Sequence, residues 1–192
     1  MDRYSWGVLG VVLFVMFSCK DVNIEPVSSA KIESTDSLVV EELIARSESS
    51  FVSNESSSVL FDQWLKDAEK IAKESNNPSA LVRIYNLLGK RQRNRSDYLE
   101  ALNNHKKALE IAIENKITSL FPECYNQLGV VYRRIDENSL ALDMHLKGMG
   151  YAEEQKDTFN ISVSLNGIGN INLSLQRYQA AIEYFRRSMA LY

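Results

Sequence analysis

Three glycines recur at a constant interval of 40 positions in this chain of 192 residues, and the residues around each glycine repeat at the same interval. Each has an aliphatic residue directly before it, an asparagine three positions before it and an alanine twelve positions after it. The repeated residues are Gly89, Gly129 and Gly169, with Asn86, Asn126 and Asn166, and with Ala101, Ala141 and Ala181. Self-similarity at a fixed period in this range is the signature of a repeat solenoid. The period therefore predicts stacked units, and solenoids bind other molecules far more often than they transform them.

The apolar residues within each period predict two helices joined by a short turn. In the middle copy we expect helices over 119–134 and 139–155, separated by a turn at 135–138, because apolar residues recur at spacings of three and four. Thr118 and Thr158 are expected N-caps, as is Ser58 for a helix that begins at Val59, and Pro78 is expected to open the helix of its own repeat. A glycine inside a helix costs about 1 kcal/mol relative to alanine, so we expect close approach of the second helix to compensate for it.

These helix pairs predict an all-α fold, an α-α superhelix of antiparallel helix pairs with a period of 40. We expect three repeats, at about 78–117, 118–157 and 158–192, preceded by a degenerate helix pair at 37–77. Ala68 lies one full period before Ala108, which places its helix in register with the later second helices. The last helix lacks a polar capping face, so we expect a truncated array or self-association through that helix.

The pattern resembles the tetratricopeptide repeat. The resemblance covers residues 58–192 and rests on Tyr85-Asn86-Leu87-Leu88-Gly89, on Tyr125-Asn126-Gln127-Leu128-Gly129, and on Tyr98, Tyr132, Tyr178, Phe185 and the three alanines. The sequence departs from the family in its period of 40 rather than 34. It also carries Leu165, Gln92 and Asn172 at usually aromatic places, and Gly148 and Ser188 where alanine is usual. The resemblance implies a superhelix whose concave wall binds proteins or peptides.

The asparagines give the best lead to a binding site. Their spacing from the glycines turns them away from the second helix, and in the resembled family that direction is the concave wall. Amides donate to and accept from a peptide backbone, and cations hold carboxylates. We therefore expect a peptide-binding site at Asn86, Lys90, Arg93, Asn126, Arg133, Arg134, Asn166 and Asn170. The alternative interpretation is that the asparagines only cap or solubilise their helices.

Catalysis, cofactors, metals and nucleic acid are not expected. The two histidines, His105 and His145, are themselves separated by one period, so they occupy equivalent places in successive repeats and are too far apart to share a metal. No catalytic set, phosphate-binding loop or metal-ligand spacing is present. The net charge of −3 provides no basic surface for nucleic acid.

The first 19 residues have the pattern of an export signal. Arg3 is followed by an apolar run from Tyr4 to Phe17, and Ser18 and Cys19 come next. Met16-Phe17-Ser18-Cys19 resembles the lipobox, in the looser form found in Bacteroidota lipoproteins, although Met16 and Phe17 depart from the usual residues. The resemblance implies a lipoprotein signal peptide over 1–18, lipidation at Cys19, a flexible tether over 19–36, and a lipid anchor in the cell envelope. Ordinary secretion and an uncleaved anchor are the alternatives, and a disulfide between Cys19 and Cys124 is not expected, since Cys124 falls inside a repeat helix.

Two functional hypotheses follow. The first is a non-enzymatic, lipid-anchored repeat protein that binds a protein or peptide on its concave face. The second is the exported sensor region of a longer regulator, with a membrane span and a histidine-kinase or DNA-binding output further along the chain.

Overall fold

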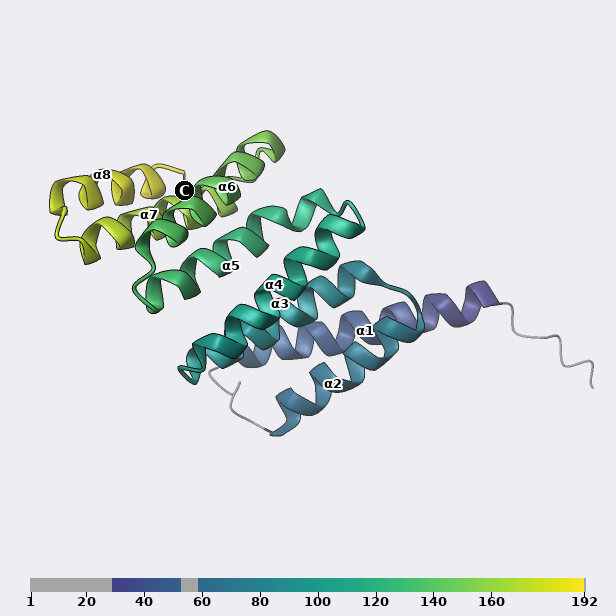
Figure 1. The fold of residues 1–192 in the computed structure, drawn as a ribbon. Helices are drawn as coiled ribbons and strands as arrows, with labels where there is room; N and C mark the ends of the chain where they lie inside the picture. The colour runs from purple at the N-terminus through teal and green to yellow at the C-terminus, as the bar shows by residue number, and fades with distance from the viewer. Residues whose placement is uncertain (1–28, 53–58, 192) are drawn as a thin grey trace, which may run out of the picture.

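A computed structural model describes residues 29–52 and 59–191, and all regular structure in these ranges is helical. The predicted signal peptide, Cys19 and Ser58 lie outside the described residues. None of the described helices is both long and apolar enough to cross a membrane. Figure 1 shows the helices, which are α1 (Ser29–Val52), α2 (Val59–Glu74), α3 (Pro78–Asn94), α4 (Tyr98–Glu114), the 3-10 helix η1 (Thr118–Leu120), α5 (Phe121–Arg134), α6 (Asn138–Gln155), α7 (Thr158–Ser174) and α8 (Tyr178–Met189).

The helices form antiparallel pairs that stack along the chain. Each odd-numbered helix packs on the even-numbered helix that follows it, and each pair packs on the next pair (Figure 1). This arrangement confirms the predicted all-α superhelix of helix pairs. It follows that residues one period apart occupy equivalent places, so any departure from the repeat can be compared directly with its neighbours.

The turns between helices are as regular as the helices. Residues in the left-handed conformation recur at intervals of half a period, and none of them is glycine: Asn76, Ser96, Lys116, Asp136, Lys156 and Gln176. At each turn the next amide donates to the carbonyl five positions earlier, as in the bonds from Asn77 to Ala72 (2.8 Å) and from Arg177 to Asn172 (2.8 Å). This is the bond of the Schellman motif that ends many helices. The repeat period is therefore two equal helix-turn units.

The N-caps differ by one residue from two of the predictions. Asp157, not Thr158, caps α7, because its carboxylate accepts from the amide of Asn160 (3.0 Å). Thr118 begins the 3-10 helix η1 and makes no capping bond. Pro78 occupies the first turn of α3 as predicted, after Asn77, whose side chain accepts from the amide of Ala80 (3.0 Å).

The first helix pair begins earlier than the sequence pattern indicates. Helix α1 starts at Ser29, inside the segment 19–36 that was expected to be a tether, and it continues through the serines at 47–50. Ser47 is fully buried, and its hydroxyl donates to the carbonyl of Leu43 (2.9 Å). Serine therefore serves as a small buried residue here, since its hydroxyl is satisfied by its own helix.

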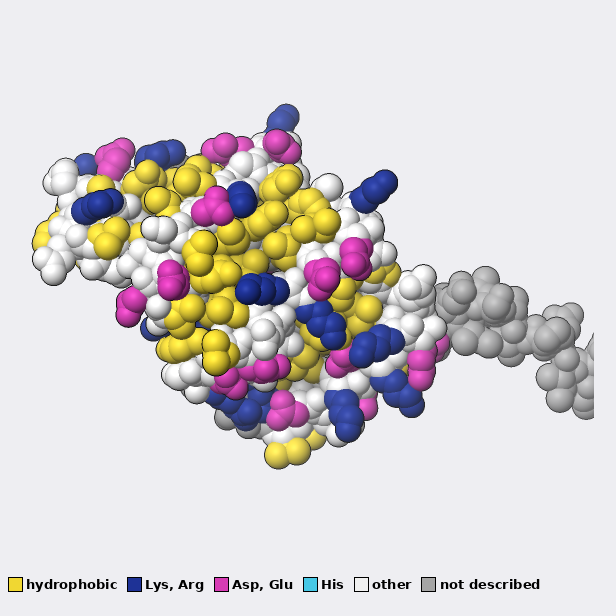
Figure 2. Space-filling model, in the orientation of Figure 1, with side chains coloured by type: hydrophobic (Ala, Val, Ile, Leu, Met, Phe, Trp, Pro, Cys, Tyr) yellow, Lys and Arg dark blue, Asp and Glu magenta, His cyan; other side chains and the backbone are white. Residues whose placement is uncertain are grey.

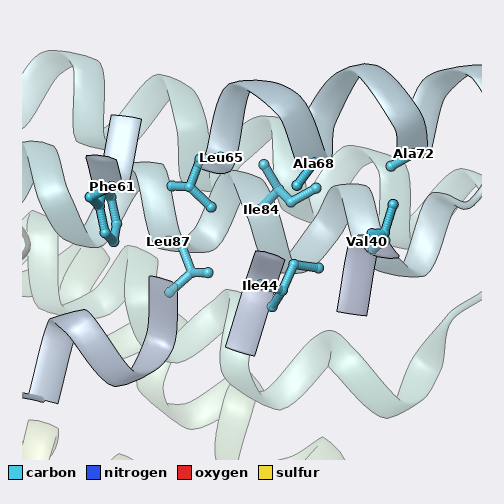
Figure 3. Packing of buried hydrophobic residues seen from close by; sticks show 9 residues of the cluster. Val40, Ile44, Phe61, Leu65, Ala68, Ala72, Ile84 and Leu87 are labelled. Carbon is cyan, nitrogen blue, oxygen red and sulfur yellow. The ribbon is translucent and has the colours of Figure 1, made fainter. Parts of the chain in front are cut away.

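A continuous apolar core joins α1, α2 and α3. Figure 3 shows Val40 and Ile44 of α1 packed near side chains of the other two helices, which are Phe61, Leu65, Ala68, Ala72, Ile84 and Leu87. All of these residues are buried, and all but the two alanines are large enough to lose considerable apolar surface from water. This packing makes α1 and α2 part of the same folded body as the three repeats.

The surface carries charges of both signs. On the face seen in Figure 2, hydrophobic side chains gather over α4, α5 and α6, and Lys, Arg, Asp and Glu side chains are interspersed around them. Charges of opposite sign are therefore mixed on this face, and neither sign dominates it.

Candidate binding surface

Two of the three asparagines that recur with the repeat period are buried. Asn86 and Asn126 are each 1% exposed, whereas Asn166 is exposed to solvent. The prediction that all three face an open concave groove is therefore wrong for Asn86 and Asn126. They face their second helices, where each binds a histidine.

Each buried asparagine pairs with a histidine of the second helix in its own repeat. The Oδ1 atom of Asn86 lies 3.0 Å from Nδ1 of His105, and Oδ1 of Asn126 lies 2.9 Å from Nδ1 of His145. Asn126 Nδ2 donates to the carbonyl of Asn160 (3.3 Å), which fixes Oδ1 as the acceptor. Nδ1 of His145 is therefore the protonated ring nitrogen, and Nε2 carries a lone pair that is buried without a hydrogen-bond partner within the described residues.

Asn126 also joins three helices. It receives a hydrogen bond from His145 of α6 and another from the hydroxyl of Ser164 of α7 (2.9 Å). The equivalent residue Asn86 makes a weaker link to the next repeat, since its Nδ2 donates to the Cys124 thiol at 3.4 Å. A buried amide with these partners fixes neighbouring helices in place and is not available to a ligand.

Each repeated glycine leaves space for an aromatic ring from the second helix of its own repeat. A Cβ atom built on Gly89 would lie 2.5 Å from Cε1 of His105, and one on Gly129 would lie 2.7 Å from Nε2 of His145. In the third repeat the Phe185 ring takes the equivalent place against Gly169, at 2.6 Å. The predicted compensation for a mid-helix glycine is thus a packed ring from the second helix rather than contact between the two helix backbones.

The buried histidines are neutral. Burial lowers the pKa of His105 to about 3 and that of His145 to about 4, and the nearby charges of Arg93 and Arg133, respectively, act in the same direction. Cys124, fully buried, has a pKa raised by burial to about 12, so its thiol is neutral as well. A buried neutral imidazole and a buried neutral thiol act here as packed structural groups.

Two of the predicted cationic residues already have partners. Lys90 Nζ forms an ion pair with Oε1 of Glu123 (2.7 Å), and Arg93 Nη1 donates to Oε1 of Gln127 (2.8 Å). Both contacts run from α3 to α5, so these side chains help to join consecutive first helices. Lys90 is therefore neutralised by a carboxylate, while Arg93 keeps its full charge.

Three arginines remain close together without a carboxylate. Burial lowers the pKa of Arg93, and the positive charges of Arg134 and Arg133 lower it further. Burial and the charge of Arg134 also lower the pKa of Arg133. Over the described part of the chain no ion pair involves any of these residues, and we refer to Arg93, Arg133 and Arg134 as the arginine cluster.

The remaining predicted residues lie on the third repeat. Asn166 Nδ2 donates to the hydroxyl of Ser188 (2.8 Å), and Asn170 Nδ2 donates to the carbonyl of Asn166 (2.9 Å). The Asn166 side chain is exposed even so, and Asn170 is half-buried. These are the two asparagines of the predicted peptide-binding site that solvent can reach.

The sequence pattern did not single out the acceptors on α5. Glu123 accepts from Lys90 and Gln127 accepts from Arg93, and both bonds join the first helices of neighbouring repeats. Glu123 follows Lys90 by 33 residues, slightly less than one period, so a comparison of opposite charges at that spacing would have indicated the pair. Gln127 has no charge, so the charge pattern of the sequence does not predict its hydrogen bond with Arg93.

The described residues contain no group of three or more His, Cys, Asp or Glu side chains that could hold a metal ion. The guanidinium groups of the arginine cluster can bind an anion, and the amides of Asn166 and Asn170 can contact a partner.

The fold defines the class of protein, a solenoid of antiparallel helix pairs. A family model described as Tetratricopeptide repeat matches residues 162–192. The crystal structure of BtubC (BKLC) from P. vanneervenii is similar, with a TM-score of 0.58 and 15% sequence identity, covering 83% of this chain and 71% of that chain. At this identity the likeness shows the fold alone, and no curated protein matches the sequence. The family match shows that the last repeat is similar to a tetratricopeptide repeat, and the described residues have the fold of an all-α repeat solenoid.

Proposed function

We propose that this protein binds a protein or peptide segment that carries carboxylates, and that the arginine cluster is the point of capture. The observation that carries the proposal is the presence of three neighbouring guanidinium groups with no carboxylate partner among the described residues. Placing like charges together costs free energy, and a bound anion would recover it. The protein is then a non-enzymatic binding module.

Arginine suits this role because its planar guanidinium group forms two parallel hydrogen bonds to one carboxylate. Arg133 and Arg93 are half-buried, and a pair of opposite charges interacts more strongly where water is partly excluded. Exposed Asn166 and half-buried Asn170 on α7 can contact the backbone of the same segment.

Fluorescence anisotropy with a labelled glutamate-rich peptide tests this proposal. We expect the wild type to bind this peptide in preference to a matched glutamine-rich peptide, with an affinity that falls as salt concentration rises. The double variant Arg133→Gln with Arg134→Gln should lose at least about tenfold in affinity, since hydrogen bonds to charged groups contribute about 1.5–3 kcal/mol each.

The matched control removes the same amount of charge elsewhere. Lys66→Gln with Lys106→Gln changes two exposed lysines on α2 and α4, the second helices of their pairs. Equal loss of affinity in both double variants would mean that only net charge matters, and it would contradict a site at the arginine cluster. Circular dichroism should show unchanged helicity in both.

We also propose that Cys19 is lipidated and anchors the protein in the cell envelope. The support is the sequence alone, namely the apolar run that ends in Ser18 and Cys19. Cells fed labelled palmitate should label the wild type and fail to label Cys19→Ala. Equal labelling of the two proteins would exclude lipidation at this residue.

A second candidate is a sensor region within a longer regulator. One observation favours it: Tyr178, Ile182 and Met189 are 59%, 45% and 68% exposed on α8, where a further repeat or a second copy would cover them. A reading frame that continues into an apolar run of about 20 residues would support a membrane-spanning regulator. A stop codon after Tyr192 would remove this candidate and leave self-association as the use of that face.

A further inference from the structure

Two equivalent repeat junctions are packed differently. At the first junction, between α4 and α5, Tyr98 and Tyr132 pack against the buried residues Leu102 and Val131. At the second junction, between α6 and α7, the equivalent places one period later hold Asn138 and Asn172. Both aromatic rings of the first junction are therefore missing from the second.

The missing rings leave a pocket. It has a volume of about 300 Å³ and is lined by apolar Leu142, Ile171 and Leu175 and by polar Asn138, Asn172 and Arg177. Leu142 is 36% exposed, whereas its equivalent at the first junction, Leu102, is 8% exposed. Cavities of this size and mixed lining bind small ligands or single side chains.

The polar groups of the pocket are not all satisfied. Oδ1 of Asn138 is buried and receives no hydrogen bond from the described residues. Asn172 Nδ2, by contrast, donates to the carbonyl of Ile168 (2.9 Å), so its amide is already engaged. A buried acceptor without a donor carries a desolvation cost that a ligand hydroxyl would remove.

We propose that the pocket between α6 and α7 binds a phenol ring, either that of a tyrosine side chain or that of a free small molecule. The ring takes the space that tyrosine fills at the first junction, and its faces contact Leu142 and Leu175. A small rotation of the Asn138 amide lets the phenol hydroxyl donate to Oδ1. Arg177, which lines the same pocket, is available for a cation–π contact with the ring. This site is independent of the arginine cluster.

Ligand-observed NMR with 4-methylphenol tests the site, because saturation transfer detects weak binding. We expect 4-methylphenol to bind and toluene to bind about fivefold more weakly, since one hydrogen bond contributes about 1 kcal/mol. N-acetyltyrosinamide distinguishes the two sources of the ring. If it binds as 4-methylphenol does, the occupant is a tyrosine side chain, and if only 4-methylphenol binds, the occupant is a small phenol.

A variant whose own side chains fill the pocket tests directly whether the phenol binds there. Asn138→Tyr with Asn172→Tyr copies the first junction and should abolish the NMR signal while raising the melting temperature. Leu142→Trp is a second variant that closes the pocket from its apolar side, and it keeps the test sharp if the tyrosine pair folds poorly. Lys106→Gln on α4, and the Arg133→Gln with Arg134→Gln variant, should bind the phenol as the wild type does.

Two results would overturn the proposal. One is the absence of 4-methylphenol binding to the wild type up to the solubility limit of the compound. The other is phenol binding that persists in folded forms of both filled variants, because the ring would then lie elsewhere on the protein.

Discussion

At the scale of single residues, the His145 ring is held between two glycines of different helices. Gly129 of α5 and Gly167 of α7 both lie so close to the ring that neither has room for a Cβ atom. The periodic glycine is therefore explained by a side chain in the second helix of the same repeat. Interiors packed this closely do not absorb an added methyl group without a shift.

Gly129→Ala is expected to destabilise the protein by about 1–3 kcal/mol, because the new methyl group displaces the His145 ring and overpacks the site. Gly150→Ala is the matched control in α6, since nothing lies within 4 Å of its added Cβ. The control should stabilise by up to about 1 kcal/mol through helix propensity. Urea denaturation measures both, and destabilisation by the same amount in the two variants would contradict the ring contact.

The buried histidines make stability depend on pH. Their pKa values are about 3 for His105 and about 4 for His145 in the folded protein, below the ordinary value of 6.5. Between these values and pH 6.5 the unfolded chain binds more protons than the folded chain, so the free energy of unfolding rises with pH. We expect a loss of about 1.4 kcal/mol per pH unit for each histidine as pH falls below 6.5.

Denaturation at pH 6 and pH 5 measures this slope. His105→Phe places at this position the residue type that the third repeat carries at Phe185, and it should reduce the slope by about half. A variant with the full slope of the wild type would mean that His105 does not contribute. The measurement concerns the slope alone, so a change in overall stability of the variant does not affect it.

The sequence predicts these residues only in part. The periodicity identified the glycines and asparagines as significant, and it placed the two histidines at equivalent positions of successive repeats, where the structure has them on α4 and α6. The spacing of three residues from the glycine predicts that Asn86 and Asn126 point away from the second helix, and this is wrong, because both side chains bind a histidine of that helix. In a superhelix each first helix contacts its own second helix and the next first helix, and both contacts involve these amides.

At the scale of elements, the turns are all built on one conformation. A left-handed residue costs about 1–2 kcal/mol when it carries a side chain, and six turns of the described chain accept this cost without glycine. The Schellman bonds at each turn compensate for it in part. The helix bounds were largely predictable since these turns interrupt the apolar periodicity twice in every period.

Lys156→Gly should stabilise the protein by up to about 1 kcal/mol, because φ is 57° at this position and glycine adopts that conformation freely. Lys106→Gly, in the exposed middle of α4, should destabilise by about 1 kcal/mol. Thermal denaturation of the two variants should therefore shift in opposite directions. A decrease in melting temperature for Lys156→Gly would contradict the strain assigned to the turn.

The elements that sequence reasoning placed poorly lie near the N-terminus. The segment 19–36 is predicted to be a flexible tether, yet α1 already begins at Ser29. The reason is tertiary: Val40 and Ile44 are buried against α2 and α3, and this packing stabilises a helix whose own pattern is weak. No local signal in the serines themselves indicates the burial of Ser47.

At the scale of the whole molecule, each helix pair contacts mainly its neighbours, and stability should be distributed accordingly. Leu65→Ala removes a fully buried side chain from the core of α1, α2 and α3 and should cost about 2–5 kcal/mol locally. Hydrogen exchange measured by mass spectrometry should show faster exchange in α1–α3 and little change in α7.

Leu60→Ala is the control on the same helix, since Leu60 is 59% exposed. It should leave exchange unchanged everywhere. A uniform increase along the whole chain in Leu65→Ala would indicate that the molecule unfolds as a single cooperative unit, contrary to this expectation.

Asn126 binds partners on α6 and α7 through a ring nitrogen, a hydroxyl and a carbonyl, while Asn86 reaches the next repeat only through a thiol. The first helices are therefore joined by contacts of different kinds. Between α3 and α5 the Asn86–Cys124 contact is supplemented by the half-buried Lys90–Glu123 ion pair (2.7 Å) and the Arg93–Gln127 hydrogen bond (2.8 Å), whereas α5 and α7 are joined by the Asn126 network. Because salt screens charges that solvent can reach, a high salt concentration should loosen the junction of α3 with α5 before that of α5 with α7.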